Sequence, residues 1–254
     1  MLKRTHISIA KAIFRKLNLP KDYEKIFIRA IVEPDNWRWR KPRYKHHYLQ
    51  YNTILEHIKQ ARRAYINGNI PTCLLSLGIA LHLIQDAFIP SPRTRELRKI
   101  HAHLERKMES YKSESSLYIN ESFIISSPKF IKSILSSIKW IYNEEDLEMI
   151  VKVSVIVTLA VFGSKDPPSG LHEKYRMLKE NHNKRVLKAS IISLINIIVG
   201  IILTLLFISS LNILSFYIIF FIFPIIPSLI FKKIVSSDKE FYEVKEEADW
   251  YGIK

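Results

Sequence analysis

LGIALHLIQDAFIP, residues 77–90, is an apolar helical stretch that carries two polar side chains, His82 and Asp86. These two side chains lie four residues apart, so they share one face of the helix about one turn apart. A helix that is apolar almost all round is expected in the centre of a bundle. The pair has two interpretations: a buried hydrogen bond that fixes a helix crossing, or two ligands of one metal ion.

The rest of the sequence predicts an all-α protein around this helix. The 254 residues include only six glycines, and no alternation of apolar and polar residues recurs at strand spacing. Pro34 is expected to end the second helix, which leaves Asp35 in an irregular connection. The helical patterns cover about residues 5–17, 20–32, 52–68, 71–88, 91–112, 128–142 and 145–162.

The segment from Ala189 to Phe231 contains no charged residue and no histidine. As one helix it would be about 65 Å long, about twice the hydrocarbon thickness of a membrane. We therefore expect a transmembrane hairpin, with helices near 189–209 and 213–231. Basic residues flank both ends, so the positive-inside rule places both the N-terminal and the C-terminal parts in the cytoplasm.

These features divide the chain into four parts and predict a multi-pass protein of the cell membrane. The parts are a helical domain (1–165), a basic juxtamembrane helix (166–188), the hairpin (189–231) and a charged cytoplasmic tail (232–254).

The formal net charge of +15 favours anionic partners, such as lipid headgroups, phosphorylated substrates or nucleic acid. Beside a transmembrane helix, a lipid headgroup is a simpler partner for basic residues than nucleic acid. The single cysteine, Cys73, excludes an intramolecular disulfide and a thiolate metal cluster. Its leucine-rich surroundings indicate a buried small hydrophobe. The sequence indicates no oligomeric state.

Further histidines and carboxylates lie before and after the central helix. The motif HAHLE repeats the four-residue spacing with His101 and Glu105. Such nitrogen and oxygen donors suit zinc. The other candidates are His6, Asp35 and the neighbouring His46 and His47.

The order of these motifs resembles the zinc-dependent phospholipases C and the related single-strand-specific zinc nucleases. The resemblance runs from about His6 to Tyr111. It implies an all-helical, phospholipase C/nuclease-like bundle that holds one to three zinc ions in a cleft and cleaves phosphodiesters. The matching segments are THISIAKAI, AIVEPDNW, HHY, AYINGN, LGIALHLIQDAFIP and HAHLE.

Carried over position by position, the resemblance implies a first zinc ion held by Asp35, His47, His82 and Asp86. His47 fits this pattern better than His46 because an aromatic residue follows it directly. Asp35 would also act in catalysis, by orienting or deprotonating a water molecule.

The resemblance also implies two further zinc sites. Asp86 would bridge to a second ion held by His6 and a free amino terminus, and His101 with Glu105 would hold another. The sequence departs from the family at Pro92, where a further histidine ligand is usual. No signal-peptide cleavage that would expose an amino terminus near His6 is evident, so the first site is the most complete.

Three functions follow from this reading. The first is a membrane-anchored phospholipase C-like hydrolase whose substrate is a phospholipid or another phosphodiester. The second is a zinc-dependent nuclease, which suits the positive charge. The third is a non-catalytic membrane protein that keeps a structural metal site.

Overall fold

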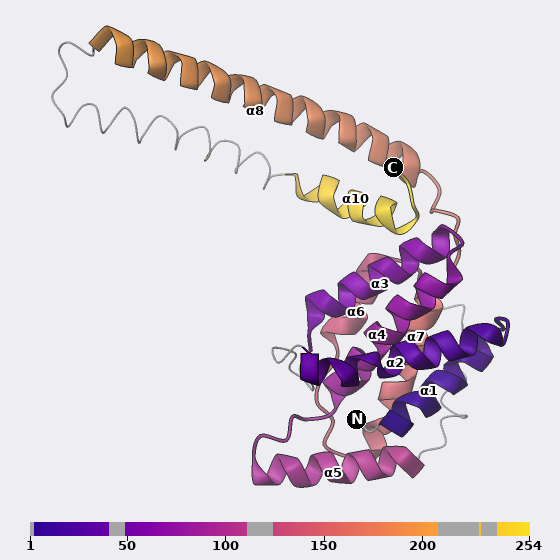
Figure 1. Ribbon diagram of the computed structural model, residues 1–254. Coiled ribbons are helices and arrows are strands. Elements are labelled where there is room, and N and C mark those ends of the chain that lie inside the picture. The colour runs from indigo at the N-terminus through magenta and orange to yellow at the C-terminus, as the bar shows by residue number, and fades with distance from the viewer. Residues whose placement is uncertain (1–2, 41–48, 111–123, 208–228, 230–237) are drawn as a thin grey trace. The chain divides into compact units, whose positions relative to one another are not determined.

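The computed structural model describes residues 3–40, 49–110, 124–207, 229 and 238–254 (Figure 1). These residues form helices and connections without a strand, which confirms the all-α prediction. A short 3-10 helix, Glu144–Asp146, precedes α7. The α-helices are α1 (Lys3–Lys16), α2 (Asp22–Arg40), α3 (Tyr51–Ile66), α4 (Ile70–Phe88), α5 (Arg95–Ser110), α6 (Pro128–Ser136), α7 (Leu147–Val161), α8 (Leu171–Phe207) and α10 (Lys239–Trp250).

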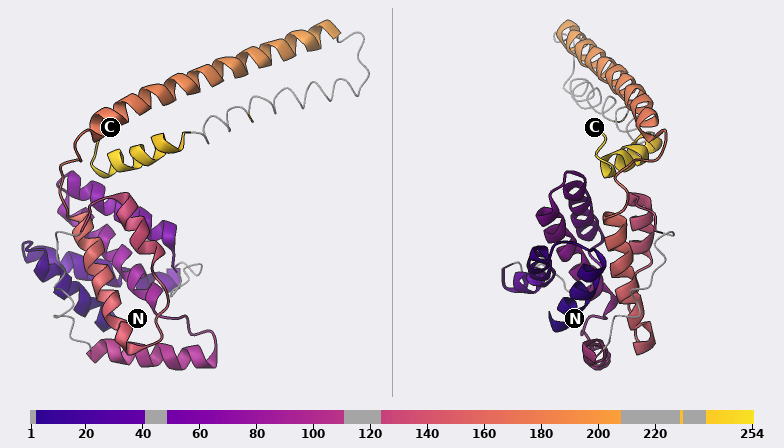
Figure 2. Two further views of the ribbon diagram at one scale, coloured as in Figure 1. Left: turned by 180° about the vertical axis from the view of Figure 1, so that it is seen from behind. Right: turned by 90° about the vertical axis from the view of Figure 1, so that its right-hand side faces the viewer.

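The centre of the helical bundle is α4. Gly68, with a φ of 76°, ends the turn after α3, and the Asn69 side chain accepts a hydrogen bond from the Thr72 N–H at the start of α4. Helices α2 and α3 pack on α4, and α7 packs on it from the side that faces the viewer in the reverse view (Figure 2). Although α4 is long and apolar enough to cross a membrane, 72% of its most apolar stretch is buried. It is therefore a core helix.

Helix α2 continues through Pro34, contrary to the prediction from sequence. A proline inside a helix costs about 3 kcal/mol, because it lacks an N–H and its ring crowds the preceding turn. That preceding turn packs tightly on α4: a Cβ added to Gly78 would lie 2.6 Å from the Cβ of Ala30. This packing offsets the cost of the proline. The prediction that Asp35 lies in an irregular connection is wrong, because Asp35 lies in α2.

The chain divides into two compact units. The first contains Met1–Asp166 together with Asp249–Lys254, and the second contains Pro167–Ala248. Residues 249–254, which the sequence assigns to a separate cytoplasmic tail, thus pack with the helical bundle. Unit 2 is an insertion between two parts of unit 1.

A fully buried arginine, Arg62 of α3, joins these two parts of unit 1. Its Nε donates to the carbonyl of Trp250 at 3.1 Å. Its Nη1 donates to the carbonyls of Val161 and Gly163 at 2.9 and 3.0 Å, and its Nη2 donates to that of Ser164. Within the described residues, carbonyl oxygens and aromatic rings rather than carboxylates thus satisfy this buried cation.

Unit 2 contains α8 and α10. Its first helix, α8, is one continuous helix of 37 residues in which the basic segment and the first apolar segment follow without a break. Only 11% of its most apolar window is buried. The predicted second apolar helix, 213–231, lies outside the described residues except for Leu229, which is exposed. The exposed apolar side chains of α8 include Ile191, Ile192, Leu194, Ile195, Ile197, Ile198, Ile201 and Ile202.

The basic half of α8 packs against α10. Asp238 accepts a hydrogen bond from His182 at 2.6 Å and pairs with Arg185, and Phe241 stacks on the His182 ring. The contacts with His182 and Arg185 lower the pKa of the Asp238 carboxyl. Aromatic and ionic contacts thus hold the two helices of unit 2 together.

Candidate metal centre

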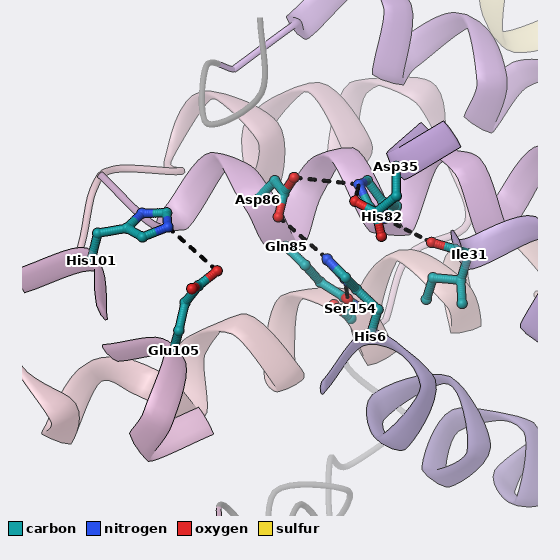
Figure 3. Close-up of polar contacts among 9 residues, drawn as sticks. All are labelled: His6, Ile31, Asp35, His82, Gln85, Asp86, His101, Glu105 and Ser154. Carbon is teal, nitrogen blue, oxygen red and sulfur yellow. Dashed lines mark hydrogen bonds and ion pairs between the residues drawn. The ribbon is translucent and has the colours of Figure 1, made fainter. Parts of the chain in front are cut away.

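Three potential metal ligands converge where α1 meets α4 (Figure 3). Asp86 lies between two histidines: its Oδ1 is 3.3 Å from Nε2 of His6, and its Oδ2 is 3.3 Å from Nε2 of His82. The two imidazole rings stack with their centroids 4.1 Å apart. Both histidine side chains are fully buried and that of Asp86 is 4% exposed. We call His6, His82 and Asp86 the buried cluster.

Helix α2 contacts both ring nitrogens of His82. The Nδ1 atom of His82 donates a hydrogen bond to the carbonyl of Ile31 at 2.7 Å. Its Nε2 atom lies 3.7 Å from Oδ1 of Asp35, one turn further along α2. The side chain of Asp35 is 33% exposed, so it forms the solvent-accessible edge of the buried cluster.

Gly78 positions these groups, because it lets α2 approach α4 closely one turn before His82. A Cβ at Gly78 would meet the backbone nitrogen of Ile31 at 3.0 Å and Ala30 at 2.6 Å. Any larger residue would displace the turn of α2 whose Ile31 carbonyl accepts the hydrogen bond from His82. Gly78 thus sets the distance between the Ile31 carbonyl and His82.

The hydrogen bonds made by Nδ1 of the two histidines decide whether Nε2 carries a proton or a lone pair. A carbonyl oxygen can only accept, so Nδ1 of His82 carries the proton and Nε2 of the neutral ring keeps a lone pair. Nδ1 of His6 lies 2.7 Å from the side-chain oxygen of Gln85, so the same holds there. Burial lowers the pKa of His6, and the neighbouring His82 lowers it further, which favours the neutral ring.

Two lone pairs and a carboxylate therefore point at one another, an arrangement that a cation stabilises. For zinc–ligand bonds of about 2.0–2.1 Å, tetrahedral geometry separates neighbouring ligand atoms by about 3.3–3.4 Å. The contact of each histidine with Asp86 is 3.3 Å, close to this separation, and each uses a different oxygen of the carboxylate. The donor set of two imidazoles and one or two carboxylates also suits zinc. The residues of the buried cluster thus fit a zinc ion.

His101 and Glu105 on α5 form a second, more exposed pair. The Nε2 atom of His101 lies 3.4 Å from Oε1 of Glu105, and Nδ1 of His101 donates to the carbonyl of Pro90 at 2.9 Å. The two side chains are 14% and 18% exposed. The contact with Glu105 raises the pKa of His101, which favours an ordinary ion pair. Pro92 lies exposed in the connection before α5.

The structure brings four of the seven predicted ligands together: His6, Asp35, His82 and Asp86. His101 and Glu105 meet each other on α5. His47, like His46, lies outside the described residues.

Two participants were missed at the sequence level, Gln85 and Ser154. Gln85 lies within the central stretch beside Asp86, and Ser154 is a hydroxyl residue in the apolar helix α7. The available signal was a further polar side chain on a helix that is otherwise apolar.

Cys73 behaves as its surroundings predict. It is fully buried on α4, and burial raises the pKa of its thiol to about 12. A thiol with this pKa stays protonated at neutral pH, so Cys73 is a packing residue rather than a nucleophile.

Within the described part of the chain, the buried cluster is the place where three histidine or acidic ligand atoms lie within 4.8 Å of one another. Its donors come from α1 and α4, with Asp35 of α2 at its edge. Comparison of the chain with protein-family models, curated proteins and solved structures gives no match.

Proposed function

We propose that this chain is a membrane-anchored, zinc-dependent phosphodiester hydrolase with a phospholipase C-like fold and action. The observation that carries the proposal is the convergence of His6, His82 and Asp86, with the partly exposed carboxylate of Asp35 beside them. Zinc bound by such donors lowers the pKa of a coordinated water toward neutrality and offsets the charge of a phosphate.

The protein groups have separate tasks in this proposal. His6, His82 and Asp86 are buried, so they hold the ion and exclude bulk water from its inner side. Asp35 faces solvent in part, so its carboxylate can orient a water molecule and accept its proton. The accessible edge at Asp35 is the side on which a phosphodiester can approach.

The membrane anchor is proposed from unit 2 and its connections. The apolar half of α8 exposes its side chains, as a helix in lipid does. Residues up to Asp166 and residues from Asp249 fold into the same unit, so an even number of crossings must lie between them. This supports a hairpin, and the flanking basic residues favour the cytoplasmic side for unit 1. Phospholipids are then the nearest phosphodiesters.

Two alternatives have observations of their own. The net charge of +15 favours a nucleic acid as the phosphodiester, which would make the protein a nuclease. The near-complete burial of His6, His82 and Asp86 favours a metal that only ties α1 to α4, without catalysis. The same experiment separates all three.

The test uses the full-length chain in detergent micelles, loaded with zinc and freed of excess metal. We expect slow hydrolysis of a chromogenic phosphodiester and of a short-chain phospholipid at neutral pH, and loss of both activities with a chelator. Hydrolysis of a single-stranded oligonucleotide alone would indicate the nuclease. Bound zinc without any turnover would indicate the structural role, and a chain that folds without binding zinc would overturn the metal proposal.

Asp35→Asn tests the assigned base. This variant keeps an oxygen donor beside His82 but loses the proton acceptor, so turnover should fall by at least about 10²-fold while zinc binding is largely kept. Glu33→Gln removes a carboxylate from the same helix two residues away and serves as the matched control. Equal activity of both variants would exclude Asp35 as the base.

A further inference from the structure

A directed chain of hydrogen bonds runs from α7 to the buried cluster. The Ser154 hydroxyl donates to the carbonyl of Ile150 at 2.8 Å. Its single proton is then used, so its oxygen must accept from Nε2 of Gln85 at 3.2 Å. This fixes the orientation of the amide, whose oxygen faces Nδ1 of His6 at 2.7 Å. Nδ1 of His6 must therefore donate.

We propose that Ser154 and Gln85 are positioning residues of the metal centre, which hold His6 in the tautomer whose Nε2 lone pair faces Asp86. The inference rests on the proposed zinc site. A metal ligand needs that lone pair, and partners of the second ring nitrogen decide where it lies. In the other tautomer, Nε2 of His6 would donate to Asp86 and close the site with an internal hydrogen bond.

The two histidines differ in how firmly their tautomers are held. His82 donates to a backbone carbonyl of Ile31, which cannot exchange donor for acceptor. His6 faces a side-chain amide, which presents either an oxygen or an NH₂ group after a half-turn. Gln85 and Ser154 are both fully buried, so within the described structure Ser154 decides between the two orientations. The hydroxyl thus acts on the metal centre through Gln85, without being a ligand.

Ser154→Thr and Ser154→Val form a matched pair for the test. Thr and Val have nearly the same size and shape at this buried position, but only Thr keeps the hydroxyl that donates to the Ile150 carbonyl and accepts from Gln85, whereas Val has a methyl group in its place. In the Val variant the amide of Gln85 loses its acceptor and can turn, which moves the proton of His6 from Nδ1 to Nε2.

Zinc affinity of the full-length chain in detergent is measured by competition with a chromophoric chelator. We expect Ser154→Val to bind zinc at least about 10-fold more weakly than Ser154→Thr, the effect typical of losing a partner of a ligand. Ser154→Thr should keep most of the zinc affinity of the wild type. Equal affinities of the two variants would overturn the inference while leaving the zinc site in place.

The tautomer itself is read without zinc and without a variant at Ser154. Magic-angle-spinning NMR of the ¹⁵N-histidine-labelled full-length chain distinguishes protonated from unprotonated ring nitrogens, and His6→Gln assigns the signals. We expect Nδ1 of His6 to be protonated in the wild type. A protonated Nε2 would overturn the inference by itself, whereas a wild type with protonated Nδ1 but no zinc binding would overturn the proposed function and leave only the tautomer assignment in place.

Discussion

The buried cluster and the His101–Glu105 pair begin from nearly the same sequence pattern, a histidine and an acid four residues apart on a helix. At His82 and Asp86 a third ligand from α1 and a carboxylate from α2 converge, and burial excludes water. On α5 no third histidine or acidic ligand atom joins His101 and Glu105 among the described residues, and both side chains keep part of their surface in solvent. The spacing therefore predicts a pair of side chains, and the neighbouring helices decide whether that pair can hold a metal.

The sharpest way to break this comparison is to neutralise one acid in each region. Asp86→Asn should lose nearly all bound zinc, because one oxygen of Asp86 faces each histidine. Glu105→Gln should keep the same zinc content as the wild type. Metal analysis of the full-length proteins, purified in detergent without chelators, checks this. If Glu105→Gln lost the zinc and Asp86→Asn kept it, the metal centre would lie at the His101–Glu105 pair instead.

The second prediction tests whether the buried cluster depends on the approach of two helices. Gly78→Ala places a methyl group against Ala30, and such overpacking costs about 1–3 kcal/mol. Ala favours a helix over Gly by about 1 kcal/mol, so a net loss of stability up to about 2 kcal/mol is expected. Chemical denaturation measures it, with exposed Leu75→Ala on the same helix as the control. Unchanged stability and zinc content would mean that the close contact is unimportant.

The third prediction adds a metal donor to the His101–Glu105 pair, so that the pair comes closer to the buried cluster in its number of donors. Pro92→His should add a donor near His101 and Glu105 and raise zinc occupancy above that of the wild type, by up to one ion per chain. The effect is modest because the pair is partly solvated. Metal analysis of Pro92→His and of Pro92→Ala gives the answer. Equal zinc contents would confine the metal centre to the buried cluster.

The smallest expected effect is the pH dependence of stability in metal-free protein. Burial lowers the pKa of His6, so the unfolded chain binds its proton more tightly and His6 costs stability as pH falls below the ordinary value of 6.5. The contact with Glu105 raises the pKa of His101, so His101 adds stability at low pH and this gain is lost as pH rises through the raised pKa.

These opposite signs are visible in melting temperatures at about pH 7.5 and about pH 5.5. Relative to wild type, His101→Gln should lose more stability at the lower pH, and His6→Gln should lose less there. Two variants that respond in the same direction would show that the regions do not differ in this way.

Much of the fold could be predicted because apolar periodicity reports directly on helices. The central position of α4 and the pairing of His82 with Asp86 follow from spacing alone. The place of Asp35 does not, since the tertiary contact at Gly78 outweighs the helix-ending preference of Pro34. Gln85 is visible in the sequence as a polar residue, but its role depends on Ser154, which lies far away in the chain. Such long-range partners have no local signal.

The arginine at position 62 has a consequence for how the protein is made. Its carbonyl partners on either side of unit 2, Ser164 and Trp250, are synthesised several seconds apart at about 5–20 residues per second. During that interval the whole apolar segment is synthesised, while the guanidinium still lacks the carbonyl and the ring of Trp250. The bundle can complete its packing around Arg62 only afterwards. If the apolar segment spans a membrane as proposed, its synthesis comes before the last step in the folding of the helical domain.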